Sequence, residues 1–211
     1  MIGKYHGTRK KVLRMTVAFT LAMAFSVSLA SAYNVCGNKL KGSWEDEYYY
    51  VSDRTEGYGS LVDDAVAAWN DAIDSTSSSS LDIDLTETRN GSARTTRVVI
   101  SPLDRGPDGY WGYTYYYDVN IFGEWKVLNY GGYPGQNYQA GSAVINKYYT
   151  DSASDARTQN VIMHEMGHIF GLMHPDYNTG SSSLMWESIV SRAKLVEPQA
   201  DDIRGVRSIY N

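Results

Sequence analysis

The chain has 211 residues, of which 43% are hydrophobic and 20% charged, and this ordinary globular composition excludes a collagen, a coiled coil and a wholly disordered segment. Its 19 basic and 24 acidic residues give a formal net charge of −5. Five of the basic residues and no acidic ones lie in the first 32 positions, so the rest of the chain carries −10, which argues against nucleic acid or an anionic membrane as a partner.

The amino-terminal segment is organised like a secretory signal. A basic stretch ends at Arg14, an uncharged apolar run covers residues 15–30, and Ala30-Ser31-Ala32 is a small-x-small cleavage site. A membrane anchor is the alternative, but the run is shorter than the 18 or so apolar residues that a spanning helix needs. We therefore expect residues 1–32 to be a signal peptide, and residues 33–211 to be one secreted, extracellular domain without stable membrane association.

The first half of this domain has alternating strand and helix patterns. Residues 44–51 are rich in aromatic side chains and predict a strand. A helix follows, closed by the serine-rich residues 75–80, and its apolar face consists of Leu61, Val62, Ala65, Val66, Trp69 and Ile73. Residues 81–86 alternate between apolar and polar side chains, Asn90-Gly91 predicts a turn, and residues 97–101 predict a further strand.

The second half adds two extended segments and two helices. Residues 102–109 read as a loop, and extended segments are expected at 110–117 and 142–147, separated by a Gly/Pro-rich stretch at 129–136. A helix is predicted over about 154–170, ending at Gly171, and a last helix opens at Pro198. Strands that mostly precede the second helix indicate an α+β fold with a mixed sheet.

The predicted helix over 154–170 carries the chemistry. It contains His164-Glu165-Met166-Gly167-His168, and two histidines four residues apart lie on one helical face, where they can bind one zinc ion. Glu165 is placed to reach a water on the same metal. Gly171 allows a sharp turn that brings His174 back as a third ligand, which leaves the fourth position open.

The histidine content strengthens this interpretation. Of the four histidines, His6 lies in the predicted signal peptide and the other three are all in the motif. The alternative, that these are ordinary surface or core histidines, leaves this spacing unexplained.

These residues resemble the signature of the metzincin zinc endopeptidases, His-Glu-x-x-His-x-x-Gly-x-x-His, which is followed by a tight turn carrying a methionine beneath the metal. Residues 183–186, Ser-Leu-Met-Trp, match that turn. Within the clan the chain is most similar to the matrixins, through its first helix with Trp69 and its closing helix from Asp201 to Tyr210. The stretch after the third histidine, residues 174–178, is closer to the serralysins, although their calcium repeats are missing.

The resemblance implies a metzincin-like catalytic domain with a mixed twisted sheet, an active-site helix and a carboxy-terminal helix. It implies that His164, His168 and His174 are zinc ligands, that Glu165 is the general base and that Met185 lies under the site. Zinc would polarise the scissile carbonyl while Glu165 passes the proton of the attacking water to the leaving amine. Glu187 stands where several clan members have a tyrosine, so no tyrosine ligand is assigned.

The resemblance also suggests where substrate and secondary groups would bind. An extended protein or peptide substrate would pair with an edge strand, for which residues 110–116 are the candidate, and the loop after Met185, to about Pro198, would wall the specificity pocket. Structural calcium is a weaker expectation, on Asp104, Asp108 and Asp118. Cys36, the only cysteine, cannot form an intrachain disulfide, and its Cys-Gly pair faintly resembles the matrixin prodomain cysteine that ligates zinc.

The predicted function is therefore a secreted, monomeric, zinc-dependent endopeptidase. A zinc-stabilised extracellular binding module without turnover is the alternative from another class, although the intact Glu165 argues against it. A hydrolase of a small amide or of a cell-wall peptide is a third, because the same machinery attacks any suitably placed amide carbonyl.

Overall fold

A computed structural model of the chain describes residues 33–42, 44, 47–74, 81, 83–88, 96–122, 124–129, 132–176 and 182–210. The predicted signal peptide, the serine-rich stretch at 75–80 and the Asn90-Gly91 turn lie outside these residues. None of the helices in the described part of the chain combines the length and the apolar character needed to cross a bilayer.

The main sheet has six strands in the order β3-β2-β4-β7-β5-β6. Its parallel part consists of β3 (Leu85–Glu87), β2 (Glu47–Val51), β4 (Val98–Leu103) and β7 (Ala140–Asn146). Antiparallel pairing adds β5 (Gly112–Val119) and β6 (Trp125–Asn129), which form a hairpin. All seven residues of β7 are buried, as is expected of a central strand covered on both faces.

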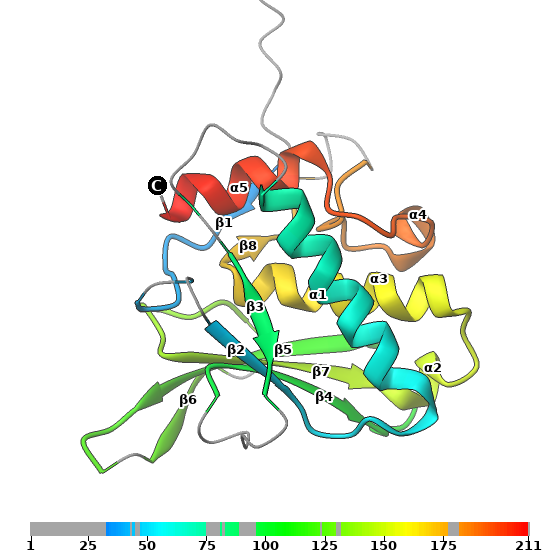
Figure 1. Ribbon diagram of the computed structural model, residues 1–211, viewed down its shortest axis with the longest axis horizontal. Coiled ribbons are helices and arrows are strands. Elements are labelled where there is room, and N and C mark those ends of the chain that lie inside the picture. Colours follow the sequence, from blue (N-terminus) through cyan, green and yellow to red (C-terminus); the bar gives the residue numbers. More distant parts are fainter. Residues whose placement is uncertain are drawn as a thin grey trace, which may run out of the picture.

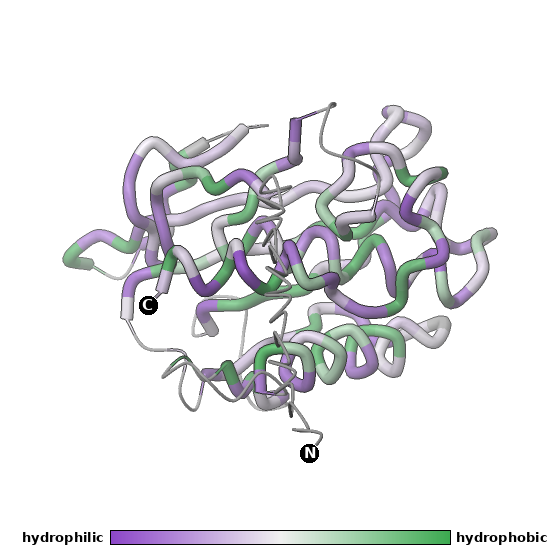
Figure 2. The backbone as a smooth tube through the Cα atoms, turned by 90° about the horizontal axis from the view of Figure 1, so that it is seen from above, coloured by the Kyte–Doolittle hydropathy of each residue, from purple (hydrophilic) through white to green (hydrophobic). Residues whose placement is uncertain are grey.

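Two long helices cover the sheet. α1 (Tyr58–Asp74) and α3 (Asp155–Ile169) pack against each other on the same side of the sheet, and α3 contacts β5 and β7 (Figure 1). In Figure 2, α1 runs along the lower edge and alternates hydrophobic and hydrophilic residues turn by turn, which is the pattern of an amphipathic helix. Trp69 of α1 is fully buried, and its indole N–H donates to the carbonyl of Met163 in α3 at 3.1 Å. This bond fixes α3 one residue before its first histidine.

Shorter elements complete the domain. β1 (Asn34–Val35) pairs antiparallel with β8 (Leu172–Met173), directly after α3. The 3₁₀ turn η1 (Thr55–Gly57) precedes α1, and α2 (Lys147–Thr150) precedes α3. α4 (Ile189–Arg192) follows the segment with Met185. α5 (Ala200–Tyr210) closes the chain and contacts β1 and β8, at the top of Figure 1.

The predicted α+β class, the mixed sheet, both long helices and the closing helix are confirmed. Two boundaries were wrong and one strand was not predicted. The strand expected at 81–86 is reduced to β3, the loop expected from residue 102 begins after Leu103, and β6 lies partly where only a Gly/Pro-rich connection was foreseen. The β5–β6 hairpin extends away from the helices at the lower left of Figure 1.

The edge predicted at 110–116 is correct only in its middle. β5 begins at Gly112, and from there to Tyr117 it pairs with β7. Its pairing with β6 begins at Tyr116, so Tyr116 is not an edge residue. Within the described residues, 112–114 pair with β7 alone, and this three-residue segment is the open edge beside α3.

Candidate metal centre

The second half of α3 is wholly buried and presents the motif inward. His164 and His168, at positions i and i+4, are 3% and 7% exposed, and Glu165 is 5% exposed. Gly167, on the same helix, lies against the thioether of Met185, and a Cβ there would collide with Sδ. Met185 therefore packs directly under this helical turn, as the resemblance implies.

Gly171 turns the chain at the end of α3. Its φ is +93°, a left-handed conformation that favours glycine, and an added Cβ would lie 3.0 Å from the carbonyl oxygen of Asn38. β8 then leads back to His174, whose main-chain N–H donates to the hydroxyl of Tyr133 at 3.1 Å and whose carbonyl accepts from the side chain of Asn34 at 3.1 Å. These bonds orient the third histidine toward α3.

The three imidazoles converge on one point. Nε2 of His174 lies 3.2 Å from Nε2 of His164 and 3.2 Å from Nε2 of His168. The Nδ1 atoms point away, and those of His164 and His168 donate to the carbonyls of Leu184 at 2.9 Å and Leu172 at 2.8 Å. These bonds leave the Nε2 lone pairs free and directed at one another. Ligand nitrogens about 2.0–2.1 Å from a tetrahedral zinc ion lie about 3.3 Å apart, so this donor set fits one such ion.

The surroundings favour neutral imidazoles, which is the form that binds metal. Burial lowers the pKa of His164 well below its usual value, with further lowering from the charge of Arg192. Burial lowers the pKa of His168 to about 3, and it also lowers that of His174. All three rings are therefore unprotonated at neutral pH.

Glu165 occupies a narrow space between α3 and β5. Thr114 Oγ1 lies 2.9 Å from Oε2 of this carboxylate and 2.9 Å from its main-chain carbonyl, so the hydroxyl can donate to either. A Cβ on Gly112 would lie 2.7 Å from Cγ and Oε1 of Glu165, and only glycine leaves room there. Burial raises the pKa of Glu165 to about 7, against the opposing effects of the Thr114 bond and of Arg192. A group with this pKa can take up and release a proton near neutral pH.

The four motif residues face a cleft of about 650 Å³. Its walls are the open edge of β5 with the preceding loop, the segment around Tyr133, and the residues after Met185 that include Glu187, Ile189 and Arg192. The loop expected to wall a pocket does line this cleft.

The segment with Met185 is held by a buried carboxylate from α5. Asp202 is fully buried, and it accepts hydrogen bonds from the Ser183 hydroxyl at 2.6 Å and from the main-chain N–H of Leu184 at 2.9 Å. The carbonyl of Leu184 is the acceptor for Nδ1 of His164. Asp202 thus positions the first histidine through the Leu184 backbone.

The structure brings together the four residues that the sequence singled out, His164, Glu165, His168 and His174. In the described part of the chain these histidines are the only group of three or more His, Cys, Asp or Glu side chains placed to hold one metal ion. Thr114, Arg192 and Asp202 were missed, because each comes from an element distant in sequence and none belongs to a motif.

Two weaker predictions receive no support. The calcium candidates do not gather into one site, since Asp104 caps the N–H of Gly106, Asp108 accepts from its neighbours, and Asp118 pairs with Lys41 at 3.2 Å. The thiol of Cys36 donates to the carbonyl of Asn38 at 2.9 Å and does not line the cleft.

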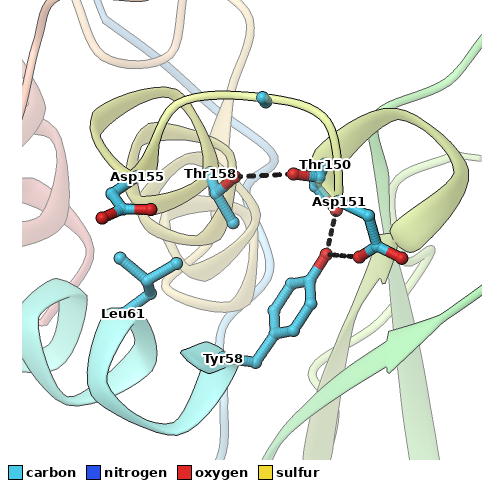
Figure 3. Close-up of a pocket in the computed structure, with 7 residues that line it drawn as sticks. Tyr58, Leu61, Thr150, Asp151, Asp155 and Thr158 are labelled. Atoms are coloured by element: carbon cyan, nitrogen blue, oxygen red, sulfur yellow. Dashed lines mark hydrogen bonds between the residues drawn. The ribbon is translucent and has the colours of Figure 1, made fainter. Parts of the chain in front are cut away.

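A second cavity, of about 330 Å³, lies between the start of α1 and the α2–α3 connection (Figure 3). Its hydroxyl groups have partners within the cavity wall: Tyr58 contacts the hydroxyl of Thr150 and donates to the carboxylate of Asp151 at 2.7 Å, and Thr158 donates to the main-chain carbonyl of Thr150 at 3.2 Å. This pairing makes it a weaker candidate than the cleft with the histidines.

Comparison with known proteins identifies the family. The sequence profile of the matrixin family matches residues 29–211. Among solved structures, a chain described as "GM1 bound form of the ECX AB5 holotoxin" is 17% identical, with a TM-score of 0.44, over 77% of this chain and 79% of that chain. A search of curated proteins finds no match.

Proposed function

We propose that this chain, which belongs to the matrixin family, is a secreted, zinc-dependent endopeptidase. Family membership indicates a zinc metallopeptidase acting on protein or peptide substrates. The observation that carries the finer proposal is the convergence of three Nε2 atoms beside the buried carboxylate of Glu165, in an open cleft.

In this proposal His164, His168 and His174 hold the metal through Nε2, and the carbonyls of Leu184 and Leu172 fix the orientation of the first two rings. A bound zinc ion supplies Lewis acidity, which polarises the scissile carbonyl and acidifies water.

Proton transfer in this proposal is the task of Glu165. Its carboxylate accepts a proton from the attacking water and delivers it to the leaving amine nitrogen. Thr114 keeps the carboxylate in place during both transfers, because its hydroxyl can donate to Oε2. The bulk of the domain excludes water from the other side of the helix, since the residues behind the motif are fully buried.

The open edge of β5 gives the substrate a place to bind as an extended strand. Residues 112–114 line the cleft and pair with β7 on one side only, and a peptide that pairs with their other side would run past Glu165. Main-chain pairing of this kind accepts many sequences, so side-chain preference would come from the wall after Met185.

A zinc-stabilised binding module remains the competing function. It needs the histidines but has no use for a buried carboxylate whose pKa is raised to about 7, since burying that group without a chemical task is unfavourable. Glu165 therefore favours the enzyme over the binding module.

The proposal is tested by incubating the zinc-loaded mature protein with a mixed peptide library and mapping the cuts by mass spectrometry. Cuts at internal bonds, lost in Glu165→Gln, are expected. Zinc-loaded protein that binds peptides without cutting any would favour the binding module, and cuts confined to small amides or cell-wall peptides would favour a narrower hydrolase.

Secretion is proposed from the basic and apolar pattern of residues 1–32 and from the Ala30-Ser31-Ala32 site. The protein recovered outside the producing cell should begin at Tyr33. Mass spectrometry of the secreted species checks this, and an intact segment 15–30 would contradict it.

A further inference from the structure

One charged side chain in the cleft wall belongs neither to the metal centre nor to an ion pair. Arg192, at the end of α4, lines the cleft although its side chain is only 4% exposed. In the described part of the chain its hydrogen bonds go to Asn160, and it has no carboxylate partner. Burial lowers its pKa to about 10, so the guanidinium is charged at neutral pH.

The bonds of Arg192 occupy one edge of the guanidinium. Nη1 donates to the main-chain carbonyl of Asn160 at 3.3 Å and to its side-chain oxygen. Nε is buried and has no acceptor, and no described residue accepts from Nη2. Nη2, which is not among the buried unpaired atoms, is therefore the donor that a ligand in the cleft can reach.

A purely structural role explains only part of this arrangement. Asn160 donates to the carbonyls of Arg192 and Leu195 at 2.9 Å and 2.7 Å, so the pair does attach the segment after Met185 to α3. The Nη1 bonds belong to this attachment. An uncharged donor would serve it equally well, whereas a buried cation with an unpaired N–H is costly and calls for an acceptor.

A carboxylate matches the Nη2 donor, because a hydrogen bond between a guanidinium and a carboxylate oxygen is charge-assisted and strong, whereas Nε lies too deep to take part. Two carboxylates line the same cleft. Glu187 is exposed and its charge acts on His174, while the charge of Glu165 acts on Arg192 but its carboxylate is hydrogen-bonded to Thr114. Neither carboxylate accepts a hydrogen bond from Arg192 in the described part of the chain, so Nη2 can donate to a ligand.

We infer that Arg192 binds a carboxylate of the substrate, so that the enzyme prefers peptides whose residue seated against α4 carries an Asp or Glu side chain or a free carboxy terminus. This inference rests on the proposed endopeptidase function and names its substrate class. Arg192 then determines specificity, while the histidines and Glu165 perform the reaction.

The test uses peptides that differ only by Glu or Gln at one position, moved in turn through the positions around the cut, each with a free or amidated carboxy terminus. The readout is the ratio of kcat/KM for the acidic and the neutral peptide, in which any loss common to both substrates cancels. Wild type should prefer one carboxylate by about 10- to 100-fold, the usual range for a hydrogen bond to a charged group.

The variants separate Arg192 from general charge effects. Arg192→Gln should bring the ratio close to one, and Arg192→Lys, which keeps the charge but loses the Nη2 donor, should give an intermediate ratio. Lys194→Gln is the matched control, since it removes an exposed positive charge of the same segment that does not line the cleft, and it should leave the ratio unchanged. Zinc-loaded Glu165→Gln, which holds peptides without cutting them, should show the same preference in affinity by calorimetry.

The outcomes are distinguishable. Preference for an internal Glu identifies the side chain as the ligand, and preference for the free terminus over the amide identifies the terminal carboxylate. Equal rates for all pairs in wild type, or a ratio that survives in both Arg192 variants, would overturn the inference while leaving the endopeptidase proposal intact. No cleavage of any peptide would remove both. If Arg192→Gln does not fold, the wild-type ratio and Arg192→Lys still decide.

Discussion

Removal of the Glu165 charge should stabilise the metal-free protein in a pH-dependent way. Burial raises the pKa of this carboxyl from an ordinary 4.5 to about 7, so the folded protein holds the proton more tightly than the unfolded chain does. The bound proton of Glu165 therefore makes its full contribution to the free energy of unfolding below pH 4.5, and this contribution is lost as the pH rises through 7. At 1.36 kcal/mol for each pH unit, the full loss is about 3 kcal/mol.

The variant for this test is Glu165→Gln, which has nearly the same shape and keeps an oxygen that can accept from Thr114. Because Gln cannot ionise, the free energy of unfolding of the variant should rise relative to that of wild type by about 2 kcal/mol between pH 5.5 and pH 8. The buried histidines act in the opposite direction, because their pKa values are lowered, but they are present in both proteins and cancel in the difference.

Urea unfolding of the two proteins in chelator, at pH 5.5 and pH 8, measures this difference. Thr114→Val, which removes the hydroxyl that stabilises the charged form, should enlarge the loss of stability toward pH 8. A difference between wild type and Glu165→Gln that does not change with pH would refute the reasoning, because it would mean that Glu165 is solvated in the folded protein.

Three further predictions concern the framework of the site. His168→Ala should lose bound zinc, measured by metal analysis, and with it the gain in the free energy of unfolding that excess zinc gives wild type, about 2.7 kcal/mol at one hundred times Kd. Gly112→Ala should keep its zinc but lose at least about 10-fold in peptide cleavage, because the new Cβ displaces the general base, whereas Gly135→Ala, with nothing within 4 Å, should cleave normally. Asp202→Ala should lower the free energy of unfolding by about 3 kcal/mol or more, because it leaves buried N–H groups without an acceptor. Asp201→Ala should lower it by less than about 1 kcal/mol, because the only described partner of Asp201 is an exposed arginine. Equal effects for the two glycine variants, or for the two aspartate variants, would contradict the packing described.

Much of the fold could be predicted from the sequence where one pattern extends over many residues. α1 and α3 carry their apolar side chains at helical spacing, and both form where expected. β6 was missed because its sequence borders a Gly/Pro-rich stretch and its pairing with β5 is a tertiary choice. β3 is shorter than the alternating pattern because the pairing with β2 in the described residues is limited to Leu85, Thr86 and Glu87.

The candidate site likewise has residues that a local sequence pattern predicts and residues that it does not. His164, Glu165 and His168 follow from helical geometry alone, and Gly171 accounts for the return of His174, as its φ of +93° confirms. Thr114 lies 51 positions from Glu165 in sequence, and Arg192 lies 32 from Asn160. Contacts of this range depend on how the sheet, α3 and α4 assemble, and no local pattern encodes them.

The central claim is that three histidines hold one zinc ion and that Glu165 is the general base of the cleavage that this ion supports. The most direct measurement is a zinc titration of the metal-free protein in which peptide cleavage and bound metal are followed together, for wild type and Glu165→Gln. Cleavage by wild type should rise to a plateau at one zinc per chain, and Glu165→Gln should bind the same single zinc while cleaving about 10²- to 10⁴-fold more slowly. Cleavage that does not depend on zinc, or a zinc-loaded Glu165→Gln that cleaves at the wild-type rate, would contradict it.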